Sequence, residues 1–108
     1  MAFWIQRCMV IENLQFIHEE GDRAPFEVTL YALSTCGFCR KSIMFLKENR
    51  IKFRYVHVDL LDFETKEKVK RYLTEKFNTR LGFPFAVLDD REFLRGFNRE
   101  EWEKKFSV

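Results

Sequence analysis

Apolar positions recur with strand and helix periods from residue 26 onward. A first strand is predicted from Phe26 to Leu33, with apolar side chains on both of its faces. Apolar residues on both faces indicate a central strand that is buried in a sheet. Apolar positions from Cys39 to Leu46 then recur at helical spacing, which predicts a helix from about Gly37 to Asn49.

A second strand and helix follow in the same pattern. The strand is predicted from about Lys52 to Val58. It comes after a crossover of helical length, so it should lie parallel to the first strand with a right-handed connection. Asp62 is expected to cap the second helix, whose apolar face carries Val69, Leu73 and Phe77.

The last third of the chain predicts a hairpin and a final helix. Two short strand-like segments, Phe85–Leu88 and Glu92–Arg95, flank a turn at Asp89–Asp90 and predict a hairpin. Asn98 followed by Glu101 resembles a capping box at the start of the last helix. The order β-α-β-α-β-β-α predicts an α/β fold with a mixed four-stranded sheet flanked by three helices.

The first 24 residues form an N-terminal extension to a domain that spans residues 25–108. A polar stretch, Glu19–Pro25, contains both Gly and Pro and marks the boundary. Apolar positions in the extension fit a helix around Val10–Ile17, whereas positions 14, 16 and 18 alternate like a strand. We favour a strand that folds back onto the next one and so adds to the sheet.

Composition narrows the class of protein. The 108 residues are 46% hydrophobic and 33% charged, which is typical of a soluble globular domain. The net charge is only +2, and basic and acidic residues are interspersed along the chain. The sequence therefore lacks the clustered basic residues that are typical of a nucleic-acid-binding surface. Thirteen Phe residues indicate an aromatic core. No signal peptide or membrane-spanning run is apparent, so we expect a cytoplasmic protein.

Candidate chemistry lies at Cys36 and Cys39, where the first strand passes into the first helix. Two intervening residues place the second sulfur one helical turn from the first, close enough to form a disulfide. The first sulfur lies at the helix N-terminus, where unpaired N–H groups and the helix dipole favour a thiolate. We therefore predict that Cys36 is the nucleophile and Cys39 the resolving thiol.

A metal site is the competing interpretation of this cysteine pair. The other candidate ligands are Cys8, His18 and His57, and none of them forms a second closely spaced pair. We therefore expect no metal site within one chain. Cys8 alone is more typical of a small buried apolar residue than of a reactive thiol.

Three segments together resemble the glutaredoxin family. Tyr31–Cys39 is similar to the active-site entry of that family, Phe83–Pro84 to its Val-Pro with a cis proline, and Arg95–Asn98 to its Gly-containing turn before the last helix. The resemblance runs from about Phe26 to Phe106. It implies a thioredoxin-like, glutaredoxin-type fold without a cofactor, and a substrate site formed by Gly37, Phe38, Phe83, Pro84, Gly96 and Phe97.

The chain departs from glutathione-using glutaredoxins at two places. Those proteins carry a basic residue three positions before the nucleophile, where this chain has Leu33. They also carry an Asp before the last helix, where this chain has Asn98 after Phe97. Arg40, Lys41, Lys76 and Arg80 are alternative sources of a cation. A Gly-Phe turn looks more like the glutaredoxin-like redoxins that receive electrons from thioredoxin reductase and serve ribonucleotide reductase.

The resemblance implies a monomer that reduces protein disulfides, ribonucleotide reductase among them. Its electron donor is a reductase or a low-molecular-weight thiol, and neither a membrane nor a nucleic acid is a partner. Cys-Gly-Phe-Cys also looks like the monothiol class of the family. The alternative is therefore a dimer in which Cys36 and Cys39 of two chains bind one iron–sulfur cluster. A redox-inert interaction module is a third interpretation.

Overall fold

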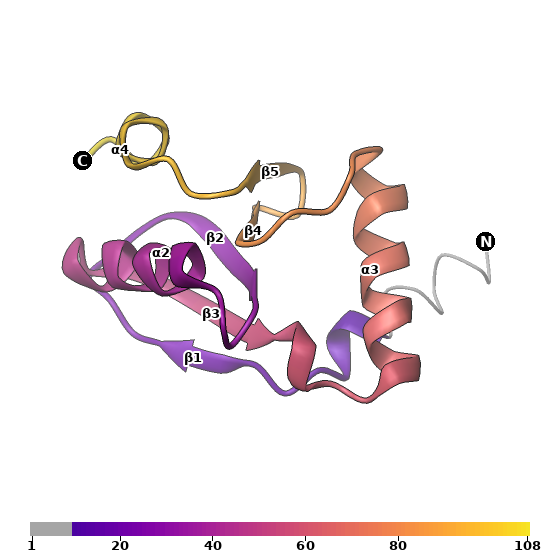
Figure 1. Cartoon of the computed structure of the whole chain (residues 1–108). Coiled ribbons are helices and arrows are strands. Elements are labelled where there is room, and N and C mark those ends of the chain that lie inside the picture. The colour runs from indigo at the N-terminus through magenta and orange to yellow at the C-terminus, as the bar shows by residue number, and fades with distance from the viewer. Residues whose placement is uncertain (1–9) are drawn as a thin grey trace.

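Five strands form one mixed sheet in the computed structural model, which describes residues 10–108 (Figure 1). The strands are β1 (Ile17–Glu19), β2 (Arg23–Ala32), β3 (Ile51–His57), β4 (Phe85–Leu88) and β5 (Glu92–Arg95). Their order across the sheet is β1-β3-β2-β4-β5. β2 pairs parallel with β3 and antiparallel with β4, so it is the central strand. The predicted α/β fold, with its buried first strand and its hairpin, is confirmed.

The extension adds a strand to the sheet, as predicted, but at a different place. β1 pairs antiparallel with β3, with Ile17 opposite Tyr55. The expectation that it folds back onto the next strand in the chain, β2, is wrong. Both edges of β2 are already occupied by β3 and β4, whereas β3 has one edge free for pairing.

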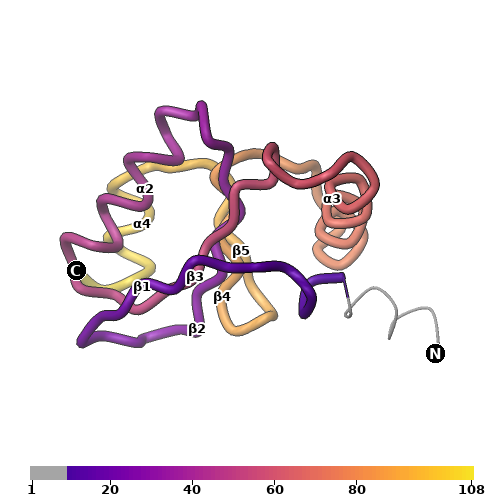
Figure 2. The backbone as a smooth tube through the Cα atoms, turned by 90° about the horizontal axis from the view of Figure 1, so that it is seen from below, coloured from indigo at the N-terminus to yellow at the C-terminus, as the bar shows by residue number. Residues whose placement is uncertain are grey.

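Helices cover both faces of the sheet. Figure 2 shows α2 (Gly37–Glu48) and α4 (Arg99–Phe106) on one side and α3 (Phe63–Phe77) on the other. The side chain of Asp62 accepts the backbone N–H of Thr65 at 3.0 Å, so the predicted cap of α3 is confirmed. A short 3-10 helix, η1 (Val58–Leu60), follows β3 and was not predicted from the sequence. None of the described helices is long and apolar enough to cross a membrane.

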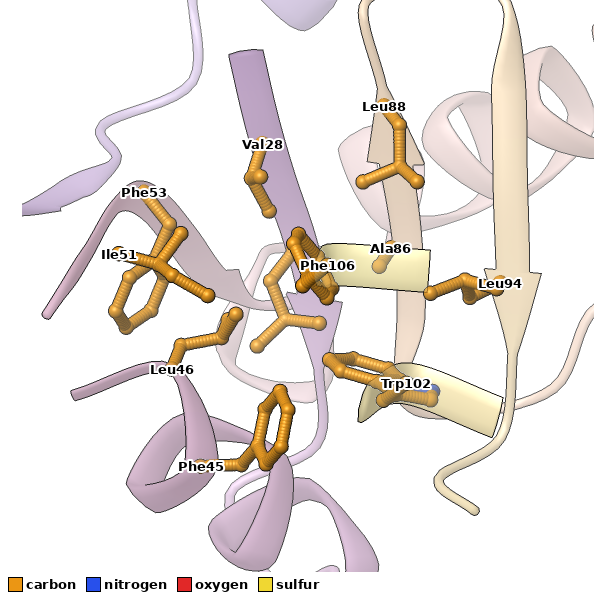
Figure 3. Close-up of a cluster of buried hydrophobic side chains, with 11 residues drawn as sticks. Val28, Phe45, Leu46, Ile51, Phe53, Ala86, Leu88, Leu94, Trp102 and Phe106 are labelled. Atoms are coloured by element: carbon orange, nitrogen blue, oxygen red, sulfur yellow. The ribbon is translucent and has the colours of Figure 1, made fainter. Parts of the chain in front are cut away.

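Two hydrophobic clusters, one on each face of the sheet, hold the helices in place. Figure 3 shows the first cluster, in which Phe45 of α2 and the two aromatic residues of α4, Trp102 and Phe106, meet over the sheet. The ring of Phe45 is fully buried and lies 6.0 Å from that of Trp102, edge to face. The second cluster packs α3 on β2 and β4 through residues such as Leu73 and Phe85. The predicted aromatic core therefore fixes α2, which contains Cys39 and is capped by Cys36, between the sheet and α4.

Candidate active site

The redox segment, residues 33–39, joins the end of β2 to the first turn of α2. Cys36 is the N-cap of α2, with extended backbone (φ −93°, ψ 118°). Its Sγ accepts the backbone N–H of Cys39 at 3.2 Å and remains partly exposed to solvent. This N–H is one of the donors that a helix N-terminus leaves without a partner. A negative charge on the Cys36 sulfur is therefore stabilised both by a hydrogen bond and by the positive end of the helix.

Cys39 lies one turn inside α2 in a very different environment. Its side chain is only 1% exposed, and its Sγ accepts the backbone N–H of Leu33 at 3.4 Å. Burial, followed by the side-chain hydrogen bond to Cys36, raises the pKa of the Cys39 thiol from 9.0 to about 12. Both cysteines are free thiols. The structure thus pairs one accessible sulfur that suits a thiolate with one buried sulfur that stays protonated.

The front of the redox segment is open. A Cβ added at Gly37 would meet only the guanidinium of Arg40, at 3.8 Å. Phe38 projects outward and is 59% exposed. The Nζ of Lys41 lies 5.3 Å from the centre of the Phe38 ring. A partner sulfur can therefore approach Cys36 past one glycine, one exposed aromatic ring and two cations.

Asp59 of η1 anchors the redox segment from the side of β3. The backbone N–H of Ser34 donates to Asp59 Oδ1 at 2.9 Å, and the Ser34 hydroxyl donates to Oδ2. These hydrogen bonds lower the pKa of Asp59 below its ordinary value. The charge of Asp59 also adds to the raised pKa of Cys39. Sequence analysis missed this contact, although an Asp at the carboxyl end of a parallel strand is a recognisable signal.

Two of the predicted substrate-site residues, Pro84 and Gly96, lie in a row with the end of β2. Tyr31 pairs with Phe85, and Phe85 pairs with Arg95, so the next residues toward the redox segment are Pro84 and Gly96. The Phe83–Pro84 bond is cis, as the resemblance implied. The N–H of Gly96 donates to the carbonyl of Pro84 at 2.7 Å. Gly96 adopts φ +79°, which a residue with a side chain rarely adopts, so the turn requires a glycine.

The structure separates the three exposed or half-exposed Phe residues that the sequence assigned to one substrate site. Phe38 and Phe97 line a single groove beside α2. Phe83 instead packs against the second hydrophobic cluster, on the other face of the sheet. Their roles in binding substrate stay predictions, as do those of Gly37, Pro84 and Gly96.

Comparison with known proteins identifies the family. A model of the glutaredoxin family matches residues 28–93, which include the redox segment, the cis proline and the hairpin as far as the start of β5. The chain belongs to the glutaredoxin family. Membership supports a thiol–disulfide redox function for the chain. No curated protein sequence matches it significantly.

Solved structures of two glutaredoxins and a methanoredoxin superpose on the chain. A glutaredoxin from Methanosarcina mazei Go1 is 25% identical, with a TM-score of 0.73 over 88% of this chain and 90% of that one. A methanoredoxin from Methanosarcina acetivorans is 27% identical, with a TM-score of 0.68 over 79% of this chain and 88% of that one. A glutaredoxin from Archaeoglobus fulgidus is 29% identical, with a TM-score of 0.64 over 74% of this chain and 85% of that one.

The structure places the two residues, Leu33 and Asn98, at which the sequence is expected to depart from glutathione-using glutaredoxins. Leu33 is half-buried against the second hydrophobic cluster and offers no charge. The side-chain oxygen of Asn98 accepts the N–H of Glu101 at 3.0 Å, which confirms its predicted role as the cap of α4. Lys76 is one of the predicted substitute cations, but its ammonium group forms an ion pair with the carboxylate of Asp90, with Nζ and Oδ1 2.8 Å apart. The remaining substitutes are Arg40, Lys41 and Arg80, and within residues 10–108 no carboxylate forms an ion pair with any of the three.

Metal binding receives no support from the described part of this glutaredoxin. Over residues 10–108, no group of three or more His, Cys, Asp or Glu side chains is arranged to hold a metal ion. Cys8 lies outside the described residues. The sulfur of Cys39 is buried and hydrogen-bonded to Leu33, so the geometry does not favour a cluster shared between two chains through both cysteines.

Proposed function

We propose that this glutaredoxin is a dithiol reductase of protein disulfides, with Cys36 as the attacking thiol and Cys39 as the resolving thiol. The difference between the two sulfurs carries this proposal. Cys36 is accessible at the N-terminus of α2 and accepts an N–H group, whereas Cys39 is buried and its pKa is raised to about 12. Only a thiolate attacks a disulfide, and a thiol does not. Cys36 can therefore react first, and Cys39 reacts only after it has lost its proton.

The first step forms a mixed disulfide. The Cys36 thiolate attacks one sulfur of the substrate disulfide, the substrate S–S bond breaks, and the other substrate sulfur leaves as a thiolate. In the second step the Cys39 thiolate attacks Cys36, which releases the second substrate thiolate. The protein ends with a Cys36–Cys39 disulfide. Two electrons have passed to the substrate, which takes up two protons.

The environment of Cys39 also determines the order of the steps. Burial is the largest cause of its raised pKa, and the hydrogen bond to the Cys36 sulfur and the negative charge on that sulfur add to it. Once Cys36 is bonded to substrate its sulfur carries no charge, so the charge effect disappears, the hydrogen bond weakens, and Cys39 becomes easier to deprotonate. Cys39 is therefore held as a thiol until a mixed disulfide exists, and it is released for attack at that point.

Electrons are best supplied by a protein donor. Glutathione carries two carboxylates and one ammonium group, and a dedicated site supplies charges for them. In this glutaredoxin, Leu33 supplies no cation, and Asn98 is neutral and already caps α4. We therefore propose that a reductase protein is preferred over glutathione. We also propose that the protein works as a monomer in the cytoplasm, where both thiols stay reduced between turnovers.

A reductase assay with cysteine variants tests this proposal. Reduction of a disulfide-bonded protein by the prereduced chain should be lost in Cys36→Ser and strongly reduced in Cys39→Ser. Cys8→Ser makes the same chemical change outside the pair and serves as the matched control with full activity. Retention of activity in Cys36→Ser would refute the proposed role of that residue.

A further inference from the structure

An open groove runs beside α2, starting at the redox segment. It has a volume of about 440 Å³ and is lined by Phe38, Lys41, Met44, Glu48, Phe97 and Arg99. We call it the α2 groove. Phe38 lies between the two cysteines in the redox segment, so one end of the groove is formed by a neighbour of both cysteines. The opposite wall is formed by the turn that precedes α4.

The walls of the α2 groove are apolar in its middle. Phe38 and Met44 are 59% and 57% exposed, although both are large apolar side chains. Phe97 is held in place because its ring packs on those of Phe45 and Trp102, at 5.8 and 5.1 Å. From position 38 to position 48 a helix rises about 15 Å. An extended chain covers that length with about four or five residues.

The charge of the groove is concentrated at its redox end. Among residues 10–108, no carboxylate forms an ion pair with Lys41, and its ammonium group lies over the Phe38 ring. At the far end, Glu48 lies 3.5 Å from Arg99, so these two charges compensate each other. A ligand in the groove therefore meets a free cation next to the cysteines and a neutral, apolar surface farther away.

We propose that the α2 groove binds the peptide segment next to the reactive cysteine of a protein disulfide substrate. The segment has an acidic residue beside its cysteine, opposite Lys41. An apolar side chain follows and lies against Met44 and Phe97. This inference rests on the proposed function, because the groove selects among substrates for attack by Cys36. A small disulfide reaches Cys36 without contacting Met44, so the groove distinguishes protein substrates from small ones.

Two peptide disulfides and one small disulfide test the groove. The acidic peptide carries Asp beside its cysteine and Leu two positions farther on, and the basic peptide has Lys in place of the Asp. Hydroxyethyl disulfide is the small substrate. The wild-type protein should reduce the acidic peptide with kcat/KM about three- to tenfold above that of the basic peptide. The Asp of the acidic peptide forms an exposed ion pair with Lys41, whereas the Lys of the basic peptide is repelled by Lys41 to a similar extent, so the two effects add.

The variants separate charge from apolar contact. Lys41→Glu should invert the preference between the two peptides. Met44→Gln should raise KM for both peptides and leave the rate with hydroxyethyl disulfide unchanged. Phe63→Gln makes a comparable change at an exposed residue outside the groove and should behave as the wild type.

The outcomes distinguish the groove from the chemistry. Equal kcat/KM for the two peptides in the wild type, or an unchanged preference in Lys41→Glu, would refute the proposed role of the α2 groove in substrate binding. Neither result would affect the proposed redox function. Failure of the wild type to reduce any of the three disulfides would overturn the proposed function and the groove together.

Discussion

Alkylation of the native, reduced protein should stop after one of the two active-site thiols has reacted. Iodoacetamide reacts with thiolates, and Cys36 presents its sulfur to solvent at the N-terminus of α2. The pKa of Cys39 is raised from 9.0 to about 12, which lowers its thiolate fraction at neutral pH by on the order of a thousandfold. Its side chain is also 1% exposed, which slows the reaction further.

The assay is a time course of alkylation at pH 7 in a Cys8→Ser background, followed by mass spectrometry of the intact protein and of its peptides. One alkyl group should be added quickly and should map to Cys36. Unfolding the protein in guanidinium chloride should remove the difference, because it exposes Cys39 and abolishes its hydrogen bonds. Equal rates of modification at the two sites in the native protein, or earlier modification of Cys39, would refute the assigned environments.

Three further predictions concern the anchor of the redox segment, the turn before α4 and the electron donor. Asp59→Asn should lower the free energy of unfolding by about 1 kcal/mol at pH 7, since it removes a charged acceptor for Ser34 that is partly exposed to solvent. The pKa of Asp59 is lowered in the folded state, so this stability is present above about pH 4 and lost as pH falls through the lowered pKa. Urea unfolding of both proteins from pH 7 to pH 2 should show the difference shrink, and a constant difference would contradict the assignment. Trp102→Phe should destabilise the protein by about 1–3 kcal/mol in thermal or urea unfolding, because it removes the indole N–H that donates to the Gly96 carbonyl at 3.1 Å; an unchanged stability would show that this hydrogen bond contributes nothing. Leu33→Lys should raise kcat/KM with glutathione about ten- to hundredfold, which corresponds to one charge-assisted hydrogen bond, and no increase would show that the missing cation does not limit glutathione use.

The parts of the fold that local sequence dictates were predictable. Asp62 and Asn98 were identified as caps because an N-cap accepts an N–H three residues ahead, which is a short-range pattern. The central position of β2 followed from apolar residues on both of its faces. The position of Cys36 and Cys39 between the end of β2 and the start of α2 was also predictable, because the cysteine pair stands where a buried strand meets a helix.

The hydrophobic pattern alone does not reveal the parts that depend on distant contacts. Asp59 and Ser34 are 25 residues apart, and only the parallel pairing of β2 and β3 brings them together. The partner of β1 depends on which strand has a free edge, which the hydrophobic pattern of the extension does not show. Met44 was not predicted as a binding residue, because the sequence shows only one apolar residue on a helix. Met44 forms part of a groove because Phe97, from another part of the chain, lines the same groove.

The division of roles between the two cysteines is tested most directly by trapping the mixed disulfide. Each single variant, Cys36→Ser and Cys39→Ser, is incubated with a disulfide-bonded protein substrate and examined by mass spectrometry without reductant. Cys39→Ser should accumulate a covalent adduct joined through Cys36, because no second thiol releases the substrate. Cys36→Ser should form no adduct, since Cys39 is buried and protonated. An adduct on Cys39 in Cys36→Ser, with none in Cys39→Ser, would contradict the account.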